Sequence, residues 1–200
     1  MPRTKEQFEA MRIEREQAIL HASLYLFATR GYDGTTADAI AAAVKCSHGL
    51  LYHYYPTKES LIKAVFDKVV HPLVSSFFNS VDYNQKAKFV LIDLTEVFLT
   101  ALKSNNDEYA WSMHLLLNLH LNGVINPSIK KVEHKKKLYD HIFELIDRGK
   151  QEGDFKDLNT RETVIAMLAM FKGLAYNRIK LGYKKFICPH SDIIMSMLLK

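Results

Sequence analysis

Cysteine is scarce in this sequence, with Cys46 and Cys188 as the only two among 200 residues. Two cysteines so far apart suggest neither a disulfide framework nor a cysteine-based zinc site, and their scarcity fits a reducing cytosol. No apolar run approaches the roughly 20 residues that a membrane span needs, and no signal peptide opens the chain. We therefore expect a cytoplasmic protein that does not insert into a membrane.

The motifs of several enzyme classes are missing as well. There is no glycine-rich phosphate loop, no Gly-x-Ser-x-Gly elbow and no His-Glu-x-x-His zinc helix. His114 and His120 are six residues apart and His134 and His141 are seven apart, so neither pair has the i,i+4 spacing of two helical ligands of one metal. We expect no catalytic activity, metal or cofactor, although a site assembled from distant residues would leave no motif.

What the sequence does contain is helical periodicity. Hydrophobic residues make up 48% of the chain and recur with helical spacing, and no run alternates with the period of a strand. The net charge of +5 mildly favours an anionic partner. After a first helix that ends at Gly31, we expect helices near residues 37–44, 47–55, 58–72, 86–103, 108–121, 126–149, 160–181 and 191–199. The predicted fold class is therefore all-α.

Two of these helices are short and closely spaced. Thr35 and Asp38 have the spacing of a capping box at the start of the first, and Ser47 is a suitable cap for the second, which ends before Pro56. Such a pair is either an ordinary helical hairpin or a helix-turn-helix whose second helix enters the major groove of DNA.

The residues left outside the core favour the second interpretation. Ile40, Val44, Leu51 and Tyr55 can point inward, which leaves a surface of hydroxyls, imidazoles and phenols on the second helix. Such groups suit phosphate oxygens and base edges better than a packed interface. The residues that we assign to DNA contact are Thr36, Lys45, Ser47, His48, Gly49, Leu50, Tyr52, His53, Tyr54 and Lys58.

The run from Ile19 to Leu61 resembles the N-terminal domain of the tetracycline-repressor (TetR) family of bacterial transcriptional regulators. The matching elements are Leu26-Phe27, Gly31-Tyr32, Thr35-Thr36, Ile40-Ala41, Ser47-x-Gly49-x-Leu51-Tyr52-x-Tyr54 and Lys58-Glu59-x-Leu61. The rest of the chain carries no motif and fits the family only as an all-helical domain. Three residues depart from the family pattern: Lys45 replaces a glycine at the corner, Leu50 a threonine and Tyr55 a phenylalanine.

The resemblance implies a domain organisation. Residues 1–57 would form a three-helix DNA-binding domain with a helix-turn-helix, and residues 58–200 a helical effector and dimerisation domain. It also implies that the last two long helices pair across a two-fold axis and that a pocket lies among the C-terminal helices. The residues that we assign to the dimer interface are Met167, Leu174, Ile194, Met197 and Leu198.

The pocket is also suggested by one helix face. Trp111, His114 and Asn118 lie near positions i, i+3 and i+7 amid leucines, which is typical of a ligand pocket and equally of a plain core. The candidate ligand-binding residues are Phe66, Phe98, Trp111, His114, Asn118 and Phe171.

The resulting prediction is a homodimeric transcriptional repressor that binds double-stranded operator DNA and releases it when an unidentified small-molecule effector binds. The alternative is a DNA-binding factor of the same fold without an effector, active in DNA organisation or cell division. Nothing in the sequence separates these two.

Overall fold

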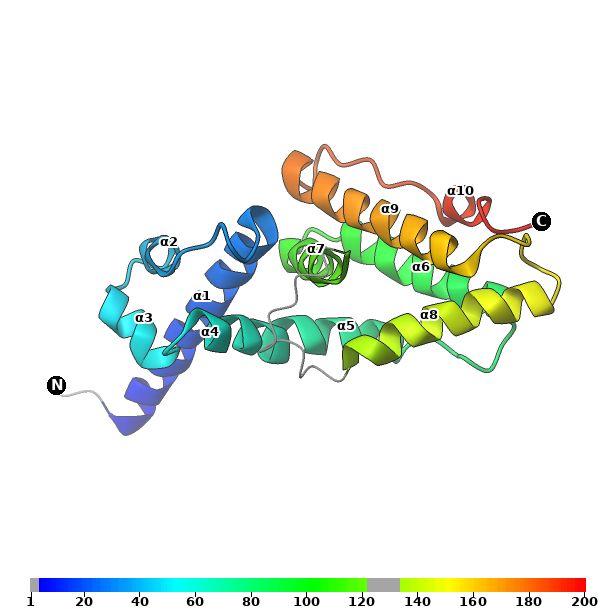
Figure 1. Cartoon of the computed structure of the whole chain (residues 1–200). Helices are drawn as coiled ribbons and strands as arrows, with labels where there is room; N and C mark the ends of the chain where they lie inside the picture. The colour runs from blue at the N-terminus through cyan, green and yellow to red at the C-terminus, as the bar shows by residue number, and fades with distance from the viewer. Residues whose placement is uncertain (1–3, 122–133) are drawn as a thin grey trace. The chain divides into compact units, whose positions relative to one another are not determined.

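The computed structural model describes residues 4–121 and 134–200, which are helical apart from turns, loops and one isolated bridge between Phe155 and Leu199. The chain divides into two compact units, Met1–Pro72 and Leu73–Lys200 (Figure 1). The all-α fold, with an N-terminal helix-turn-helix and a helical C-terminal part, is confirmed. The boundary expected after residue 57 stays a prediction, since the first compact unit continues through Pro72.

The first unit is built on one long helix. Its segments are α1 (Lys5–Arg30), α2 (Ala37–Ala43), α3 (His48–Tyr54), α4 (Lys58–Val65) and the π-helix η1 (Phe66–Val70). The capping box of Thr4 and Gln7 starts α1, and Gly31 ends it with a φ of 76°, a left-handed value that favours glycine.

The core of this unit draws on all four α-helices. Ile19 and Phe27 of α1, Ile40 of α2, Leu51 of α3 and Ile62 of α4 are each at most 2% exposed. Because α1 packs against both α2 and α4, and α2 packs against α3, the short pair is held in place by the long helix.

The helix that was expected near residues 58–72 is divided into segments. It is α-helical through Val65, a π-helix from Phe66 to Val70, and α-helical again in α5 (His71–Phe78). The His71 N–H bonds to the Phe66 carbonyl across this wider turn, and Pro72 follows without an N–H to donate. The helix therefore changes its pitch just before the proline.

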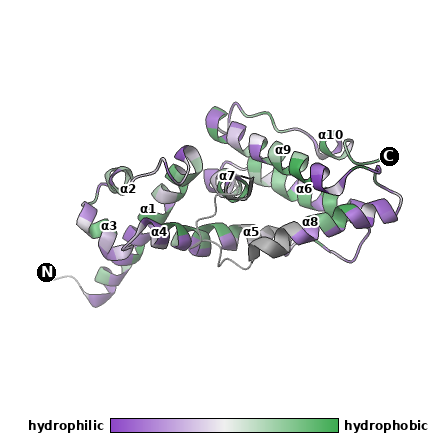
Figure 2. Cartoon of the chain, viewed as in Figure 1, coloured by the Kyte–Doolittle hydropathy of each residue, from purple (hydrophilic) through white to green (hydrophobic). Residues whose placement is uncertain are grey.

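The second unit contains α6 (Ala87–Lys103), α7 (Asp107–Leu121), α8 (His134–Gln151), α9 (Thr160–Leu181) and α10 (Ser191–Met195). The α9 helix packs against α7 and α8, and α6 packs against α7, α8 and α10. Hydrophobic residues predominate on α6, whereas hydrophilic and hydrophobic turns alternate along α8 and α9 (Figure 2). The expected start of a helix at residue 126 lies outside the described residues.

The last helix is shorter than the spacing predicts. It ends at Met195, and the chain then runs antiparallel to the segment after α8, where the Lys156 N–H bonds to the Leu198 carbonyl at 2.8 Å. Phe155 in that segment is buried. A Cβ added to Gly149 would lie only 2.2 Å from the nearest atoms of the Phe155 ring. Only a glycine in α8 lets the ring approach so closely.

A buried cation closes the C-terminal end of α6. Arg178 of α9 is 1% exposed; its guanidinium donates to the carbonyls of Leu102 at 3.0 Å and Ser104 at 2.9 Å, and to the Asp107 carboxylate at 2.7 Å. Carbonyls at the end of a helix lack partners within the helix, and Arg178 supplies them. Across residues 4–121 and 134–200, no helix is both long and apolar enough to cross a membrane.

Candidate nucleic-acid interface

The first short helix begins one residue later than the capping box suggested. Thr36 is the N-cap of α2, and its hydroxyl oxygen accepts from the Ala39 N–H at 3.1 Å. Thr35 is instead buried, and its hydroxyl donates to the Gly31 carbonyl at 2.7 Å. The expected box between Thr35 and Asp38 is therefore wrong, and the Asp38 carboxylate is available for another contact.

The corner between α2 and α3 is strained at one residue. Lys45 has a φ of 53°, in the left-handed region, and is the only non-glycine residue with a positive φ in the described part of the chain. The Cys46 N–H bonds to the Ala41 carbonyl at 2.9 Å and closes the turn. A residue with a Cβ costs about 1 kcal/mol in this conformation relative to glycine.

The second short helix has its apolar residues inward, as the spacing predicts. Ser47 caps α3 by accepting from the Leu50 N–H at 3.2 Å. Leu51 and Tyr55 are buried with Ile40 of α2. The opposite face of α3 therefore remains outside the core.

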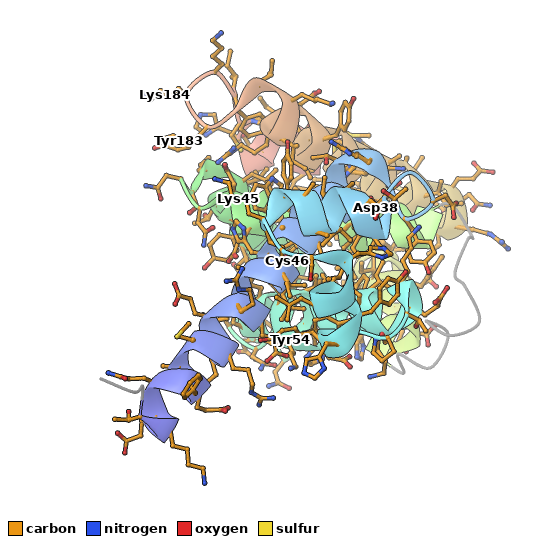
Figure 3. All side chains as sticks on the ribbon, turned by 90° about the vertical axis from the view of Figure 1, so that its left-hand side faces the viewer. Asp38, Lys45, Cys46, Tyr54, Tyr183 and Lys184 are labelled. Carbon is orange, nitrogen blue, oxygen red and sulfur yellow. The ribbon has the colours of Figure 1, made fainter. Side chains whose placement is uncertain are left out.

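The structure brings the predicted DNA-contacting residues of both helices to the surface of this unit. The exposed residues are Thr36, Lys45, Ser47, His48, Gly49, Tyr52 and His53, and the half-buried ones are Leu50 and Tyr54. Lys45 and Tyr54 are labelled in Figure 3 on the light-blue and cyan helices. Their contact with DNA stays a prediction.

A polar contact joins the two short helices at this surface. Asp38 Oδ1 of α2 lies 3.2 Å from His48 Nε2 at the start of α3. The imidazole also meets the Tyr52 ring edge to face, with the ring centroids 4.7 Å apart. His48 is therefore held between a carboxylate and a phenol ring.

Lys58 starts α4 after the Thr57 cap, and its ammonium lies 4.2 Å from the centroid of the Tyr32 ring. The Tyr32 hydroxyl donates to Glu59 Oε1 at 2.9 Å. A hydrogen bond from its own backbone N–H and then the bond from Tyr32 lower the pKa of the Glu59 carboxyl. Lys58 is half-buried, and its charge also contributes to the lowered pKa of the Glu59 carboxyl.

Residues 19–65, which contain these contacts, match the family model described as bacterial regulatory proteins, tetR family. This segment, about a quarter of the chain, is therefore similar to the DNA-binding segment of that family. The resemblance stated from the sequence is confirmed. Within the described residues, no group of three or more histidine, cysteine, aspartate or glutamate side chains could hold a metal ion.

Two curated relatives match part of this chain. An uncharacterized HTH-type transcriptional regulator, YuxN of Bacillus subtilis, is 39% identical over 54 residues, which are 27% of this chain and 19% of that protein. The HTH-type transcriptional repressor Rv3405c of Mycobacterium tuberculosis is 40% identical over 67 residues, which are 34% and 32% of the two chains. The chain thus matches about a third of these relatives or less.

The fold as a whole has solved counterparts. The crystal structure of AibR in complex with isovaleryl coenzyme A and operator DNA covers 92% of this chain and 98% of its own, with a TM-score of 0.68 and 20% identity. At that identity the likeness shows the fold alone.

The predicted ligand-binding residues fall in both units. Phe66 is buried in η1 of the first unit. In the second unit, Phe98 of α6 and Phe171 of α9 are brought together, with ring centroids 4.7 Å apart. On α7, His114 is 5% exposed, and Trp111 and Asn118 are half-buried. Whether these residues bind a ligand stays a prediction.

Three of the predicted dimer residues are covered by their own chain, and their place in a dimer stays a prediction. Met167, Ile194 and Leu198 are each 3% exposed, because the helices of the second unit already cover them. Leu174 is half-buried and Met197 is 47% exposed. The sequence identified α9 and the C-terminal segment as apolar but assigned mostly their core-facing residues to the interface.

Three residues that the sequence did not assign to a site lie beside the candidate sites. Asp38 contacts His48, and the Tyr176 ring of α9 lies 5.5 Å from that of His114. The Ser112 hydroxyl on α7 is buried without a hydrogen-bond partner. The spacing of Asp38 pointed to a cap instead, and the other two carry no signal, because nothing along the chain indicates which helix packs against α7.

Proposed function

We propose that this protein is a transcriptional repressor that binds double-stranded operator DNA as a homodimer and releases it when a small-molecule effector binds to the second unit. The observation that carries the proposal is the outward face of α3, where His48, Tyr52 and His53 are exposed on a helix whose inward residues are buried. Hydroxyls, imidazoles and phenols suit phosphate oxygens and base edges. Rv3405c, a repressor, is 40% identical to this chain over 67 residues.

The first experiment tests DNA binding. Wild-type protein is used to select duplexes from a random-sequence library, and the selected sequences are compared with the input. A dimer that reads two successive major grooves should select two inverted half-sites about 34 to 36 Å apart. If no sequence is selected, the proposal is overturned. If a single half-site is selected, the protein binds DNA but not as the proposed dimer.

We place the dimer interface on the exposed side of α9. Ile165, Ala169, Gly173 and Tyr176 are exposed at intervals of three or four residues, so they share one face of the helix. Apolar and small residues on an exposed helix face allow close packing of a second helix.

A charge on that face should dissociate the dimer. Ala169→Glu is expected to yield a monomer by sedimentation equilibrium, because the carboxylate would be buried without a partner. Phe89→Glu is the matched control, since Phe89 is 46% exposed on α6 and lies outside the proposed face. If Ala169→Glu remains as dimeric as the control, the interface is not on this side of α9.

The effector site is proposed around α7, where the His114 imidazole and the unpartnered Ser112 hydroxyl are buried among apolar residues. A buried hydroxyl without a partner would gain a hydrogen bond from a polar ligand atom. Trp111 is the only tryptophan, so ligand binding near α7 should change the intrinsic fluorescence of the protein. AibR binds isovaleryl coenzyme A, which makes acyl thioesters of coenzyme A the first probes.

The coupling of effector to DNA separates the proposal from the alternative, a DNA-binding factor without an effector. Trp111→Ala should change the release of DNA by an effector more than it changes the affinity for the selected duplex, and Phe66→Ala in the first unit should do the same. Release equal to that of wild type in Trp111→Ala would contradict the proposed pocket around α7, and in Phe66→Ala it would remove Phe66 from the response. DNA binding that no small molecule in a broad panel changes would favour the alternative function.

A further inference from the structure

Two exposed side chains from different helices meet on the outward surface of the helix-turn-helix. The Asp38 side chain is 85% exposed in the first turn of α2, and the His48 side chain is 52% exposed at the first residue of α3. Asp38 Oδ1 and His48 Nε2 are 3.2 Å apart. Asp38 is labelled in Figure 3 on the light-blue helix.

The contact does not serve the ends of the helices. Thr36 already caps α2 and Ser47 already caps α3, each through its own hydroxyl. An exposed pair between a carboxylate and an imidazole also contributes little to stability, since water competes for both groups. Its main effect is therefore geometric: with the Tyr52 ring on one side, the carboxylate restricts the orientation of the imidazole.

The orientation decides which nitrogen of His48 is available to DNA. Because Nε2 faces the Asp38 carboxylate, Nδ1 is the ring nitrogen that is left for DNA. A neutral imidazole with its proton on Nε2 offers an acceptor at Nδ1, and an imidazolium offers a donor there. An acceptor suits the amino group of adenine or cytosine in the major groove, whereas a donor suits N7 or O6 of guanine. A ring that is free to rotate presents both nitrogens and discriminates less.

We infer that Asp38 is a positioning residue for sequence recognition: it holds His48 with Nδ1 toward the base pair and so determines base preference from outside the recognition helix. This inference rests on the proposed DNA binding. It places a specificity determinant on α2, in a residue that contacts the reading side chain. It also predicts that the effect of Asp38 depends entirely on His48.

The test measures base preference at each position of the duplex that the wild-type protein selects from a random library. All single base-pair changes are measured with wild type, Asp38→Ala, His48→Ala and the double variant. Asp38→Ala should reduce the preference about tenfold at one position per half-site, the same position that His48→Ala affects. In the double variant, the loss should equal that of His48→Ala alone, because the two residues act as one unit.

Two further variants separate positioning from charge and from folding. Asp33→Ala removes a carboxylate that is exposed in the turn before α2 and should leave base preference unchanged at every position. Asp38→Asn keeps an oxygen that accepts from Nε2–H and should restore most of the preference that Asp38→Ala loses. A role limited to the stability of α2 would weaken binding to all duplexes alike and would not single out one position.

Three results would overturn the inference. The first is that Asp38→Ala changes no position, the second that it changes a position that His48→Ala does not affect, and the third that the two losses add in the double variant. If wild type binds its selected duplex and one of these is found, the inference fails while the proposed function stands. If wild type selects no sequence, both fail together.

Discussion

The Tyr55 hydroxyl donates a hydrogen bond to Glu16 Oε1, with the two oxygens 2.9 Å apart. Lys68 of η1 binds the same carboxylate oxygen, so the residue that follows α3, the middle of α1 and the π-helix meet at Glu16. The hydrogen bond from Lys68 is the largest cause that lowers the pKa of the Glu16 carboxyl; burial opposes it, and the bond from Tyr55 adds to it. Tyr55 stands where the family pattern has a phenylalanine, and the additional hydroxyl has Glu16 as its partner.

Removal of this hydroxyl should destabilise the first unit. Tyr55→Phe keeps the buried ring and loses a hydrogen bond to a carboxylate, so we expect the free energy of unfolding to fall by about 1.5 kcal/mol. Urea denaturation followed by circular dichroism measures it. Tyr52→Phe, at an exposed ring of α3, is the control and should change the free energy of unfolding by less than about 0.5 kcal/mol. Equal losses in the two variants would contradict a role for the Glu16 contact.

The same contact predicts a dependence on alkaline pH. Burial and then the Glu16 carboxylate raise the pKa of Tyr55 well above its usual value of 10.0. A raised pKa in the folded state means that the contribution of the neutral phenol to stability is complete below about pH 10 and is lost as the pH rises further. Above about pH 10, wild type should lose free energy of unfolding more steeply than Tyr55→Phe. Parallel pH profiles of urea denaturation would be evidence against the raised pKa.

The strained corner predicts a stabilising substitution. Lys45→Gly should raise the free energy of unfolding by roughly 0.5 to 1 kcal/mol. Glycine adopts the φ of 53° without the steric cost of a Cβ, and this gain outweighs the extra flexibility of glycine in the unfolded chain. Lys45→Ala keeps a Cβ and should bring no such gain. Thermal unfolding of the two variants distinguishes the backbone effect from the loss of the charge, which they share.

Lys58 is predicted to contact phosphate rather than bases. Lys58→Ala should weaken binding to the selected duplex and to random DNA alike, and the slope of log affinity against log salt should flatten by about 0.9 for each lost contact. Lys63→Ala is the matched control, because Lys63 is an exposed lysine of α4 that pairs with Asp67 of η1. If Lys58→Ala leaves the slope unchanged, the Lys58 ammonium of the wild type stays over the Tyr32 ring and does not reach DNA.

The buried cation of the second unit should be required for its stability. Arg178→Met fills much of the same volume but leaves the carbonyls of Leu102 and Ser104 without their donor, so we expect a loss of about 2 to 3 kcal/mol. Arg161→Met, at an exposed position of the same helix, should be close to neutral in the same urea titration. A near-neutral Arg178→Met would mean that water replaces the guanidinium at these carbonyls.

Periodicity was sufficient to predict the helices, because burial imposes a 3.6-residue repeat on each of them. The expected range 160–181 coincides with α9, and the expected helix end at Gly31 coincides with that of α1. The boundaries that differ were decided by local hydrogen bonds: Thr36 instead of Thr35 caps α2, and the backbone of residue 198 pairs with residue 156 instead of extending α10.

The candidate sites were less predictable than the helices. An apolar residue at helical spacing faces either this chain or a partner, and the spacing of Met167 and Ile194 is the same in both cases. Only the packing of α9 and α10 shows that both residues are already covered. The contact between Asp38 and His48 joins residues from two helices across a turn, and no periodicity along one helix can indicate it.

The Phe155 ring and a side chain at Gly149 would occupy the same space, so the size of one residue limits the size of the other. The Phe155 ring fills the volume of the missing Gly149 side chain and sits beside the bridge that anchors the segment through Leu199. A related chain with alanine or a larger residue at the position of Gly149 should therefore carry a smaller side chain at that of Phe155. The two positions are expected to covary across relatives that keep this antiparallel pairing, and either substitution made alone should loosen it.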